Sequence, residues 1–349
     1  MEKYYTRACN FFYHSTKKKT KIPRGHYFLS GNKRITFDSV EIISRKSKKK
    51  IKNTEIKFLK KSLRNKIYSD LKKITKKKKF LKIKFKDTPL IMGVVNVTPD
   101  SFSDGGRYNS AKKAFIHAKS LIKAGCDIID IGAESTRPGS KTINNKIEWK
   151  RLSAPLKKIK KLNKIISIDT RKTFVMEKSL KFKINLINDV SGLSHDKLTL
   201  NFLKLTKIPF VIHHTQGSPI NMQISPKYKN VILEIYDFFE KKIDHLRSFG
   251  IKHNNIILDP GIGFGKNLKH NMIILKNISI FHSLGFPLLI GTSKKRFIKD
   301  LSKNNDSKER HGGTISSNIF LMNQGVQILR VHDVNEINQG LKVYKALLE

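Results

Sequence analysis

The sequence predicts an α/β protein whose residues 86–349 form a (β/α)8 barrel, preceded by a basic extension over residues 1–85. Three observations carry this prediction. After residue 86 there are eight short apolar runs rich in β-branched residues, the stretches between them have helical periodicity, and every run ends in polar side chains. The 349 − 85 = 264 residues of this part match the usual length of such a barrel.

The basic extension differs from the rest in composition. Residues 1–85 hold 28 Lys and Arg against 5 acids, a charge of 28 − 5 = +23 out of +44 for the whole chain. Alternation over 35–43 predicts a strand or hairpin, and 62–74 could form an amphipathic helix, but no fold follows from these segments. The lysine clusters at 48–50 and 76–79 are typical of solvated surfaces, and contact of the extension with nucleic acid is the less favoured alternative.

The eight apolar runs predict the strands of the barrel. They span 91–97, 127–133, 165–170, 186–192, 209–215, 256–261, 287–293 and 328–333. Helix candidates lie between them, for example 111–124, 227–249 and 314–323, each of which ends at or near a glycine. Strands that alternate with helices in this way are typical of a parallel sheet.

A doubly wound nucleotide-binding sheet is the competing architecture, and it requires a glycine-rich turn after its first strand. The best candidate, 261–266, instead follows the sixth run. Pro260 occupies the first-glycine position of a P-loop, and Asn267 stands where Ser or Thr is required. We therefore expect these glycines to let the backbone approach a ligand closely.

Two cysteines, Cys9 and Cys126, do not suggest a disulfide framework. No apolar run approaches the roughly 18 residues that a membrane-spanning helix needs. We expect a cytoplasmic protein with no membrane association.

Polar residues at the ends of the runs form the candidate site, because the carboxyl ends of barrel strands share one mouth. In order they are Asn96, Glu134 to Arg137, Asp169 with Arg171, Asn188 with Asp189, His214 with Gln216, Asp259, Ser293 with Lys294 and Lys295, and Arg330 with His332. Any one of them could be an ordinary cap or turn residue. Eight polar ends together favour a binding site.

The chemistry of these ends divides into two groups. Carboxylates, an amide and a lysine suit a planar hydrogen-bonding heterocycle, and they come from Asp169, Asn188, Asp259 and Lys295. Donors and cations suit phosphate oxygens, and they come from Asn96, Thr136, Arg137, Arg330 and His332. The sequence therefore predicts a ligand in which a heterocycle is joined to a phosphate leaving group.

Six segments, in order, resemble the signature blocks of the dihydropteroate synthase family. They are IMGVVNVTPDSFSDGG (91–106), DIGAESTRPG (130–139), IDT (168–170), INDV (187–190), DPGIGFGK (259–266) and RVHDV (330–334). The first two blocks are long and specific, whereas the short ones are weak alone. The resemblance covers the chain from about residue 90 to its end.

This resemblance implies a transferase of folate biosynthesis that condenses 6-hydroxymethyl-7,8-dihydropterin diphosphate with 4-aminobenzoate and releases pyrophosphate. It implies Mg²⁺ as the cofactor, held with the help of Asn96, and a homodimer. The implied roles follow the two groups of residues. The pterin would be bound by Asp169, Asn188, Asp259, Lys295 and Arg330, the pyrophosphate by Asn96, Thr136, Arg137, Arg330 and His332, and the aminobenzoate by Phe102, Pro138 and Ser293.

Within the pterin group, the resemblance makes Asp169, Lys295 and Arg330 the catalytic residues. Three positions depart from the family pattern. His213 and Thr215 stand where the family usually has methionine, and Lys294 stands where it commonly has arginine. We expect the surroundings of the pterin to be more polar here.

Two other functions stay open at this point. A pterin-dependent methyltransferase domain shares the barrel and several pterin contacts, but its relatives lack the loops that begin near residues 98 and 135. A nucleic-acid-binding protein built on an inactive barrel would fit the charge of +44. The intact polar ends, including Asn96, Asp169 and Lys295, argue against an inactive barrel.

Overall fold

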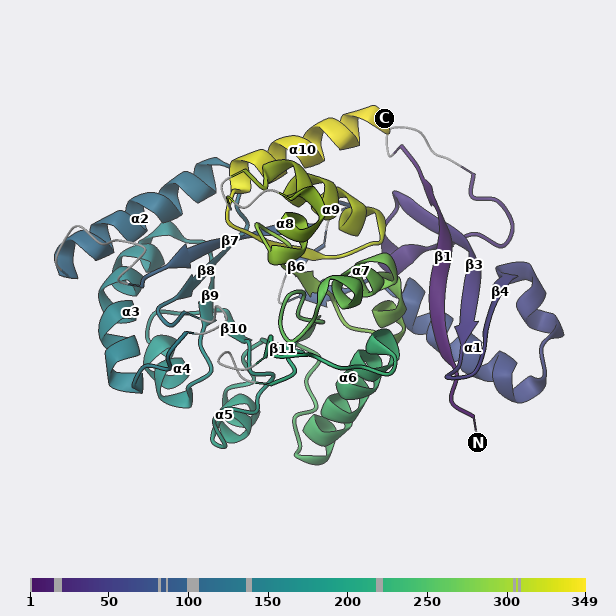
Figure 1. The fold of residues 1–349 in the computed structure, drawn as a ribbon, viewed down its shortest axis with the longest axis horizontal. Helices are drawn as coiled ribbons and strands as arrows, with labels where there is room; N and C mark the ends of the chain where they lie inside the picture. Colours follow the sequence, from purple (N-terminus) through teal and green to yellow (C-terminus); the bar gives the residue numbers. More distant parts are fainter. Residues whose placement is uncertain are drawn as a thin grey trace.

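The protein is described by a computed structural model that covers residues 2–15, 21–80, 83–85, 87–98, 107–135, 140–217, 222–303, 306 and 309–349. An eight-stranded parallel sheet forms its centre, with strands in the order β12-β11-β10-β9-β8-β7-β14-β13. A parallel bridge between Leu258 and Leu288 joins the two ends of this order and closes the ring. The predicted barrel is confirmed (Figure 1).

Each of the eight predicted runs contains one strand. The strands are β7 (Leu90–Asn96), β8 (Ile128–Gly132), β9 (Ile165–Asp169), β10 (Leu186–Asp189), β11 (Phe210–His213), β12 (Ile256–Asp259), β13 (Leu289–Ile290) and β14 (Ile328–Val331). Seven strands are shorter than their runs because the last residues of the run turn away into the loops of the mouth, whereas β7 is as long as its run and begins one residue earlier.

Helices surround the barrel and cover the outer surface of its strands. They are α2 (Arg107–Lys123), α3 (Asn145–Ile159), α4 (Thr173–Leu180), α5 (Thr199–Thr206), α6 (Val231–Ser248), α7 (Leu268–Lys276), α8 (Arg296–Ser302), α9 (His311–Asn323) and α10 (Val334–Leu347). Asparagine side chains cap several of them: Asn144, Asn230 and Asn267 each accept a backbone N–H of the first turn of α3, α6 and α7.

Two cores follow from the alternation of side chains along the strands. One set of side chains points outward and packs against the helices in a large cluster that includes Ile131, Ile168 and Ile212. The other set fills the lumen of the barrel. This lower lumen layer consists of Leu90, Met92, Ile128, Leu186, Val211, Ile257, Leu289 and Ile328. The barrel is therefore a packed core with no open pore through this layer.

The N-terminal extension folds as an antiparallel sheet with one helix beside it. The central strand β3 (Ile35–Ile43) pairs with β1 (Tyr5–Tyr13), with β2 (Tyr27–Phe28) and with β4 (Lys48–Lys52), and α1 (Lys61–Thr75) packs against the sheet. A short hairpin, β5 (Lys79–Phe80) and β6 (Ile83–Lys84), leads to the barrel. The predicted strand over 35–43 and the predicted helix over 62–74 are both present.

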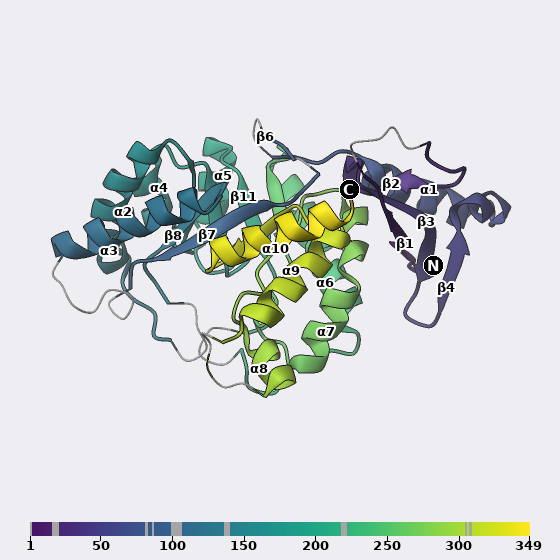
Figure 2. The same cartoon turned by 90° about the horizontal axis from the view of Figure 1, so that it is seen from above.

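This sheet lies against one side of the barrel, next to α6 and α7 (Figures 1 and 2). Tyr5 and Ile43 belong to the same apolar cluster as the outer core of the barrel. Asp237 of α6 accepts hydrogen bonds from Lys3, from the Tyr5 hydroxyl and from Arg45. The extension is thus joined to the barrel by apolar packing and by ion pairs.

The lysine cluster at 76–79 is not uniformly solvated, which corrects the expectation from the sequence. Lys78 is buried, and its ammonium group donates a hydrogen bond to the Lys73 carbonyl oxygen at 2.6 Å. Burial lowers the pKa of Lys78 to about 7, and the neighbouring Lys76 and Lys73 lower it further. Lys48, Lys49 and Lys50 are exposed, as expected.

Cys9 and Cys126 are both buried free thiols. None of the helices in the described ranges combines the length and the apolar character that a bilayer crossing requires.

Candidate functional site

The candidate site is a second, polar layer of lumen side chains directly above the apolar one. Successive side chains of a strand alternate between its two faces, so the residue two positions after a lumen residue also points into the lumen. Counting two positions from the lower lumen layer gives Val94, Asp130, Asn188, His213, Asp259, Gly291 and Arg330, and Asp169 lies at the same level because it is paired with Asn188; this upper lumen layer is polar except at Val94 and Gly291. The site is therefore built on the apolar floor of the barrel.

Arg330 of β14 crosses the lumen to two buried carboxylates. Its Nε donates to Oδ2 of Asp130 at 2.6 Å, and its Nη2 donates to Oδ2 of Asp169 at 2.7 Å. The Asn188 amide donates to the same oxygen of Asp130 at 3.2 Å. The second oxygen of Asp130 and the amide oxygen of Asn188 are buried and have no hydrogen-bond partner among the described residues. Buried acceptors of this kind favour a ligand that supplies donors.

The charges of this cluster change the pKa of Asp169. Burial raises the pKa of Asp169 to about 7; Arg330 opposes the increase, whereas the nearby Asp130 carboxylate adds to it. When Asp169 is ionised, one guanidinium between two carboxylates leaves a net negative charge at the mouth. A cationic group on a bound ligand would be stabilised there.

Asp259 and Lys295 form the opposite side of the pocket. Asp259 Oδ1 accepts the Gly261 backbone N–H at 2.8 Å, and burial raises the pKa of the Asp259 carboxyl. Lys295 donates to the Ile262 carbonyl oxygen and lies 4.8 Å from the centre of the Phe264 ring. Burial lowers the pKa of Lys295 to about 8, although Asp259 favours its charged form. This lysine can therefore exchange a proton near neutral pH.

The loop after β12 requires glycine at its first turn. Gly261 has a φ of +68°, and a Cβ there would lie 2.0 Å from the His214 carbonyl oxygen. No other residue fits this close approach of two loops. From the sequence we expected these glycines to let the backbone approach a ligand closely. At Gly261 the group that comes close is the backbone carbonyl of His214.

Four residues at the upper rim lie in one row across adjacent strands. Asn96 is paired with Gly132, Gly132 with Asp169, and Asp169 with Asn188. Asn96 ends β7 and is partly exposed. Because Gly132 has no side chain, Asn96 and Asp169 are separated in this row by bare backbone. The Asp169 side chain lies over this position, because a Cβ at Gly132 would be 3.0 Å from the Asp169 Cβ.

Ser293, Lys294 and His332 lie together at the ends of β13 and β14. The Ser293 hydroxyl oxygen accepts the His332 backbone N–H at 3.3 Å, and Lys294 forms an ion pair of 2.9 Å with Asp333. Lys294 therefore holds the end of β14 in place, whereas the Ser293 hydroxyl proton stays available for a further acceptor.

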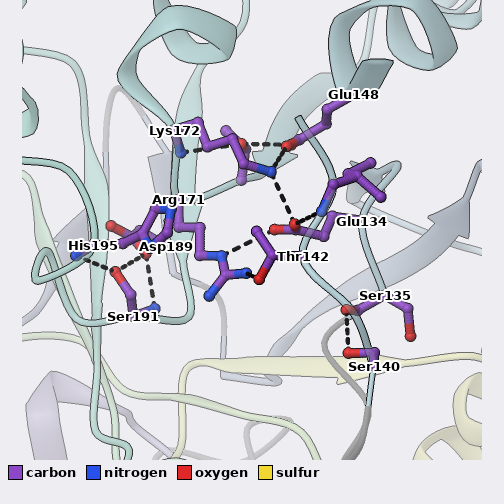
Figure 3. Close-up of polar contacts among 12 residues, drawn as sticks. Glu134, Ser135, Ser140, Thr142, Glu148, Arg171, Lys172, Asp189, Ser191 and His195 are labelled. Atoms are coloured by element: carbon purple, nitrogen blue, oxygen red, sulfur yellow. Dashed lines mark hydrogen bonds and ion pairs between the residues drawn. The ribbon is translucent and has the colours of Figure 1, made fainter. Parts of the chain in front are cut away.

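A network of charged residues supports the loops after β8 and β9 (Figure 3). Glu134 accepts hydrogen bonds from Arg171 at 2.9 Å, from Lys172 at 2.8 Å and from the Ile143 backbone N–H at 2.9 Å. Lys172 also binds the buried Glu148 at 2.5 Å. Although burial opposes it, these hydrogen bonds hold the pKa of Glu134 below its usual value. Glu134 and Arg171 are therefore supports of the mouth.

The structure brings together most of the residues predicted from the sequence. Asp169, Asn188, Asp259, Lys295 and Arg330 lie close together at the mouth of the barrel, and Ser293 and His332 lie at the ends of the neighbouring strands. Phe102, Thr136, Arg137 and Pro138 lie outside the described residues. Within the described residues, no cluster of three or more His, Cys, Asp or Glu side chains could hold a metal ion.

Asp130 was missed in the sequence analysis, and among the strand ends of β11 His214 was chosen, although the family resemblance had named His213 as part of the pterin surroundings. Asp130 lies within a signature block but before the end of its run, and only the alternation of β8 identifies it as a lumen residue. On β11 the predicted site residue was His214, yet its side chain contacts Lys266 at 3.0 Å and the Phe238 ring. The lumen residue is His213, which follows Val211 by two positions.

Comparison with known proteins agrees with this geometry. A family model described as "Pterin binding enzyme" matches residues 92–332. The chain is 41% identical over 266 residues to a dihydropteroate synthase of Neisseria meningitidis serogroup B, covering 75% of this chain and 93% of that protein.

Solved structures give the same result. The Xanthomonas albilineans dihydropteroate synthase with 4-aminobenzoic acid matches with a TM-score of 0.70 and 33% identity, covering 75% of this chain and 93% of that one. The structure of that organism's enzyme in complex with 7,8-dihydropteroate matches with a TM-score of 0.67 and 31% identity, covering 75% and 94%. The chain therefore belongs to the dihydropteroate synthase family of pterin-binding enzymes, which are transferases of folate biosynthesis.

Proposed function

We propose that the barrel mouth condenses 6-hydroxymethyl-7,8-dihydropterin diphosphate with 4-aminobenzoate to give 7,8-dihydropteroate and pyrophosphate. The observation that carries the proposal is the upper lumen layer, in which Arg330 joins Asp130 and Asp169 beside Asn188. The two complexes of the similar Xanthomonas enzyme, one with 4-aminobenzoic acid and one with 7,8-dihydropteroate, support the same substrate and product.

The pterin ring fits the pocket between Asp169, Asn188, Asp259 and Lys295. The unpartnered Asn188 amide oxygen and the two carboxylates accept its N–H groups, and Lys295 donates to its carbonyl oxygen. Arg330 lies beside the ring, with its guanidinium held by Asp130 and Asp169. A buried, rigid donor and acceptor set of this kind loses little energy to reorganisation during the reaction.

The reaction proceeds by departure of pyrophosphate before attack by the arylamine. The carbon–oxygen bond to the diphosphate breaks, the pair of electrons leaves with pyrophosphate, and the pterin methylene becomes cationic. The negative cluster of Asp130 and Asp169 stabilises this cation. The aminobenzoate nitrogen then forms the new bond and loses its proton, and no strong base is needed because an arylamine is already neutral at pH 7.

The leaving group would be held by Asn96, Thr136, Arg137, His332 and the outer side of Arg330, whose side chain is 24% exposed. Mg²⁺ would neutralise the diphosphate charge. The residues fit this ion, because Mg²⁺ at phosphate sites needs few protein ligands and takes the rest from phosphate and water, so the partly exposed Asn96 amide is sufficient. The lack of a dedicated acidic cluster in the described residues agrees with this arrangement.

The aminobenzoate would bind at the rim, with its carboxylate near the Ser293 hydroxyl and its ring against Phe102 and Pro138. The Ser293 oxygen already accepts the His332 backbone N–H, so its proton is free to point at a carboxylate. The carboxylate is thus placed on the opposite side of the mouth from Asn188.

We extend the proposal to the organisation of the chain. Residues 86–349 would be the catalytic domain and residues 1–85 an extension outside the chemistry, which agrees with the family match over 92–332. The enzyme would act as a homodimer in the cytoplasm; two buried free thiols are compatible with a reducing compartment. Sedimentation of the purified full chain tests the homodimer.

The decisive experiment is an assay for 7,8-dihydropteroate from the two substrates, with and without Mg²⁺. We expect Mg²⁺-dependent product from the wild-type chain and a large loss in Asp169→Asn, which keeps the size of the side chain. Exchange of exposed Lys76 for Met is the matched surface control and should leave the rate unchanged. Absence of product from folded wild-type protein that still binds pterin would overturn the proposal.

A further inference from the structure

His213 is a member of the upper lumen layer that no role above uses. It ends β11, follows the lumen residue Val211 by two positions, and is paired in register with Asp259 of β12. Its neighbours in the layer, Asn188 and Asp259, belong to the proposed pterin pocket. The position alone therefore places the imidazole at the floor of that pocket.

The contacts of the ring fix its orientation. Nε2 lies 3.9 Å from Oδ2 of Asp259, and the ring packs edge to face against Phe264 with centres 4.6 Å apart. Cε1 lies 2.9 Å from the point that a Cβ of Gly261 would occupy. Nε2 therefore faces the Asp259 carboxylate, and Cε1, the carbon between the two ring nitrogens, lies against the turn at Gly261.

Nδ1 is buried and has no hydrogen-bond partner among the described residues. Buried polar atoms almost always find a partner in the protein, in water or in a ligand, because an unpaired one is costly. A side chain that served packing alone would have no need of a nitrogen at this position. The unpaired atom therefore indicates a partner that arrives with the ligand.

The protonation of the ring is also set by its surroundings. Burial lowers the pKa of His213 well below its usual value, and the cations Lys266 and Lys295 lower it further. A neutral imidazole carries one proton. Because the Asp259 carboxylate faces Nε2, the proton is favoured on that nitrogen, and Nδ1 is left with a lone pair.

We propose that His213 determines heterocycle specificity by accepting, through Nδ1, a hydrogen bond from an N–H group of the pterin ring. This inference rests on the proposed function and deepens it. The acceptor adds to those of Asp259 and Asn188, and it gives this chain a polar contact where an apolar side chain would only pack. Selectivity follows because a ring without the matching N–H would leave Nδ1 unpaired.

Three substitutions in the full chain separate the two ring nitrogens from simple packing. His213→Asn places an amide oxygen near the position of Nδ1, and His213→Gln places its amide near the position of Nε2. His213→Met keeps the volume of the side chain but has no polar group at either position. Binding of 6-hydroxymethyl-7,8-dihydropterin is measured by titration calorimetry, and KM is measured for each substrate. Thermal unfolding of every variant reports on packing.

We expect His213→Met and His213→Gln to weaken pterin binding by about 10-fold, the worth of one hydrogen bond, and His213→Asn to stay within about 3-fold of wild type. KM for the pterin diphosphate should rise in parallel, while KM for 4-aminobenzoate should not change. The matched control is His282→Asn, a buried histidine beneath the extension, which should lower the unfolding temperature without weakening pterin binding.

Wild-type affinity in His213→Met, or equal losses in the Asn and Met variants, would overturn the inference. Calorimetry needs no turnover, so the test remains valid if dihydropteroate is not formed. Failure of the proposed function would appear as missing product in wild type, whereas failure of this inference would appear as unchanged pterin binding in His213→Met.

Discussion

The two ends of the barrel each hold a buried lysine with a lowered pKa, and their surroundings differ. Lys295 at the mouth lies in a pocket with Asp259, and its pKa is lowered by burial to about 8. Lys78 lies near the opposite end, beneath the extension, and burial lowers its pKa to about 7. The charges that affect this pKa are those of other lysines. Lys295 has the Asp259 carboxylate beside it as well as the Arg330 guanidinium, whereas among the described residues Lys78 is affected only by like charges. The comparison shows that a perturbed pKa marks a site only where its neighbours offer complementary chemistry.

The lumen layers show the same contrast. The lower lumen layer is entirely apolar, whereas the upper lumen layer leaves acceptors of Asp130, Asn188 and His213 unpaired within the described residues. The apolar floor keeps water away from the charges above it and strengthens their interactions. One end of the lumen is therefore built for stability and the other for binding.

The largest effect is expected at the mouth. Replacement of Arg330 by Met removes the cation between Asp130 and Asp169 and should lower kcat by about 10²- to 10³-fold. Arg330→Lys keeps the charge but loses the two-pronged geometry, so it should recover only part of the rate. A steady-state assay beside circular dichroism spectra separates rate from folding. A folded Arg330→Met enzyme with more than a tenth of wild-type activity would contradict the division of the lumen into two layers.

The lower lumen layer should respond in stability. Ile257 is fully buried in it, and Ile257→Ala should lower the free energy of unfolding by about 2–5 kcal/mol, because a cavity remains. Ile257→Val should cost about 0.5–1.5 kcal/mol. Urea unfolding measures both values, and the rate per folded molecule should stay near wild type. A loss of rate without a loss of stability would show that the lower layer takes part in the chemistry.

Most of the barrel could be predicted because its strands are short apolar runs and its helices end at glycines. The missed site residues have a physical explanation. In the run that contains His213 and His214, all side chains from 210 to 214 are buried, so the pattern of apolar and polar residues does not show which histidine faces the lumen, and only the family resemblance pointed to His213. A shift of one residue reverses the assignment. The predicted roles of Phe102, Thr136, Arg137 and Pro138 remain predictions.

The extension could not be predicted as a fold because its central strand, although its sequence alternates, is buried on both faces. Every residue of β3 is buried, including Asp38 and Glu41. Their charges are satisfied by Lys52 on β4 and by Arg7 on β1, which lie far away in the sequence. Buried acids of this kind are recognised only when their partners are known.

A smaller effect is expected at the mouth when Asp130 is replaced. Asp130 raises the pKa of Asp169, after burial, through repulsion between the two carboxylates. In Asp130→Asn this repulsion is absent, so the pKa of Asp169 should fall by about one unit. If ionised Asp169 is the active form, the acidic side of the pH profile of kcat/KM should move to lower pH by that amount. A shift to higher pH would show that Asp169 acts in its protonated form.

The smallest effect concerns the opposite end of the barrel. The folded pKa of Lys78, about 7, is below the usual 10.5, so folding favours the neutral amine. The stability cost is therefore absent above about pH 10.5, grows as the pH falls, and is complete below about pH 7. Lys78→Met removes this cost but loses the hydrogen bond to the Lys73 carbonyl oxygen. We expect the variant to be more stable than wild type by about 1 kcal/mol at pH 6.

The pH dependence distinguishes this cause from a general gain in packing. The advantage of Lys78→Met should shrink as the pH is raised from 7 to 10, because the wild-type lysine then becomes neutral in the folded state. Exposed Lys49, which is not among the charges that affect Lys78, is exchanged for Met as the control and should give a difference that does not depend on pH in this window. Urea unfolding at pH 6, 8 and 10 measures both variants. An advantage of Lys78→Met that stays constant from pH 6 to pH 10 would mean that Lys78 is charged in the folded protein, and the contrast with Lys295 would then lie in burial alone.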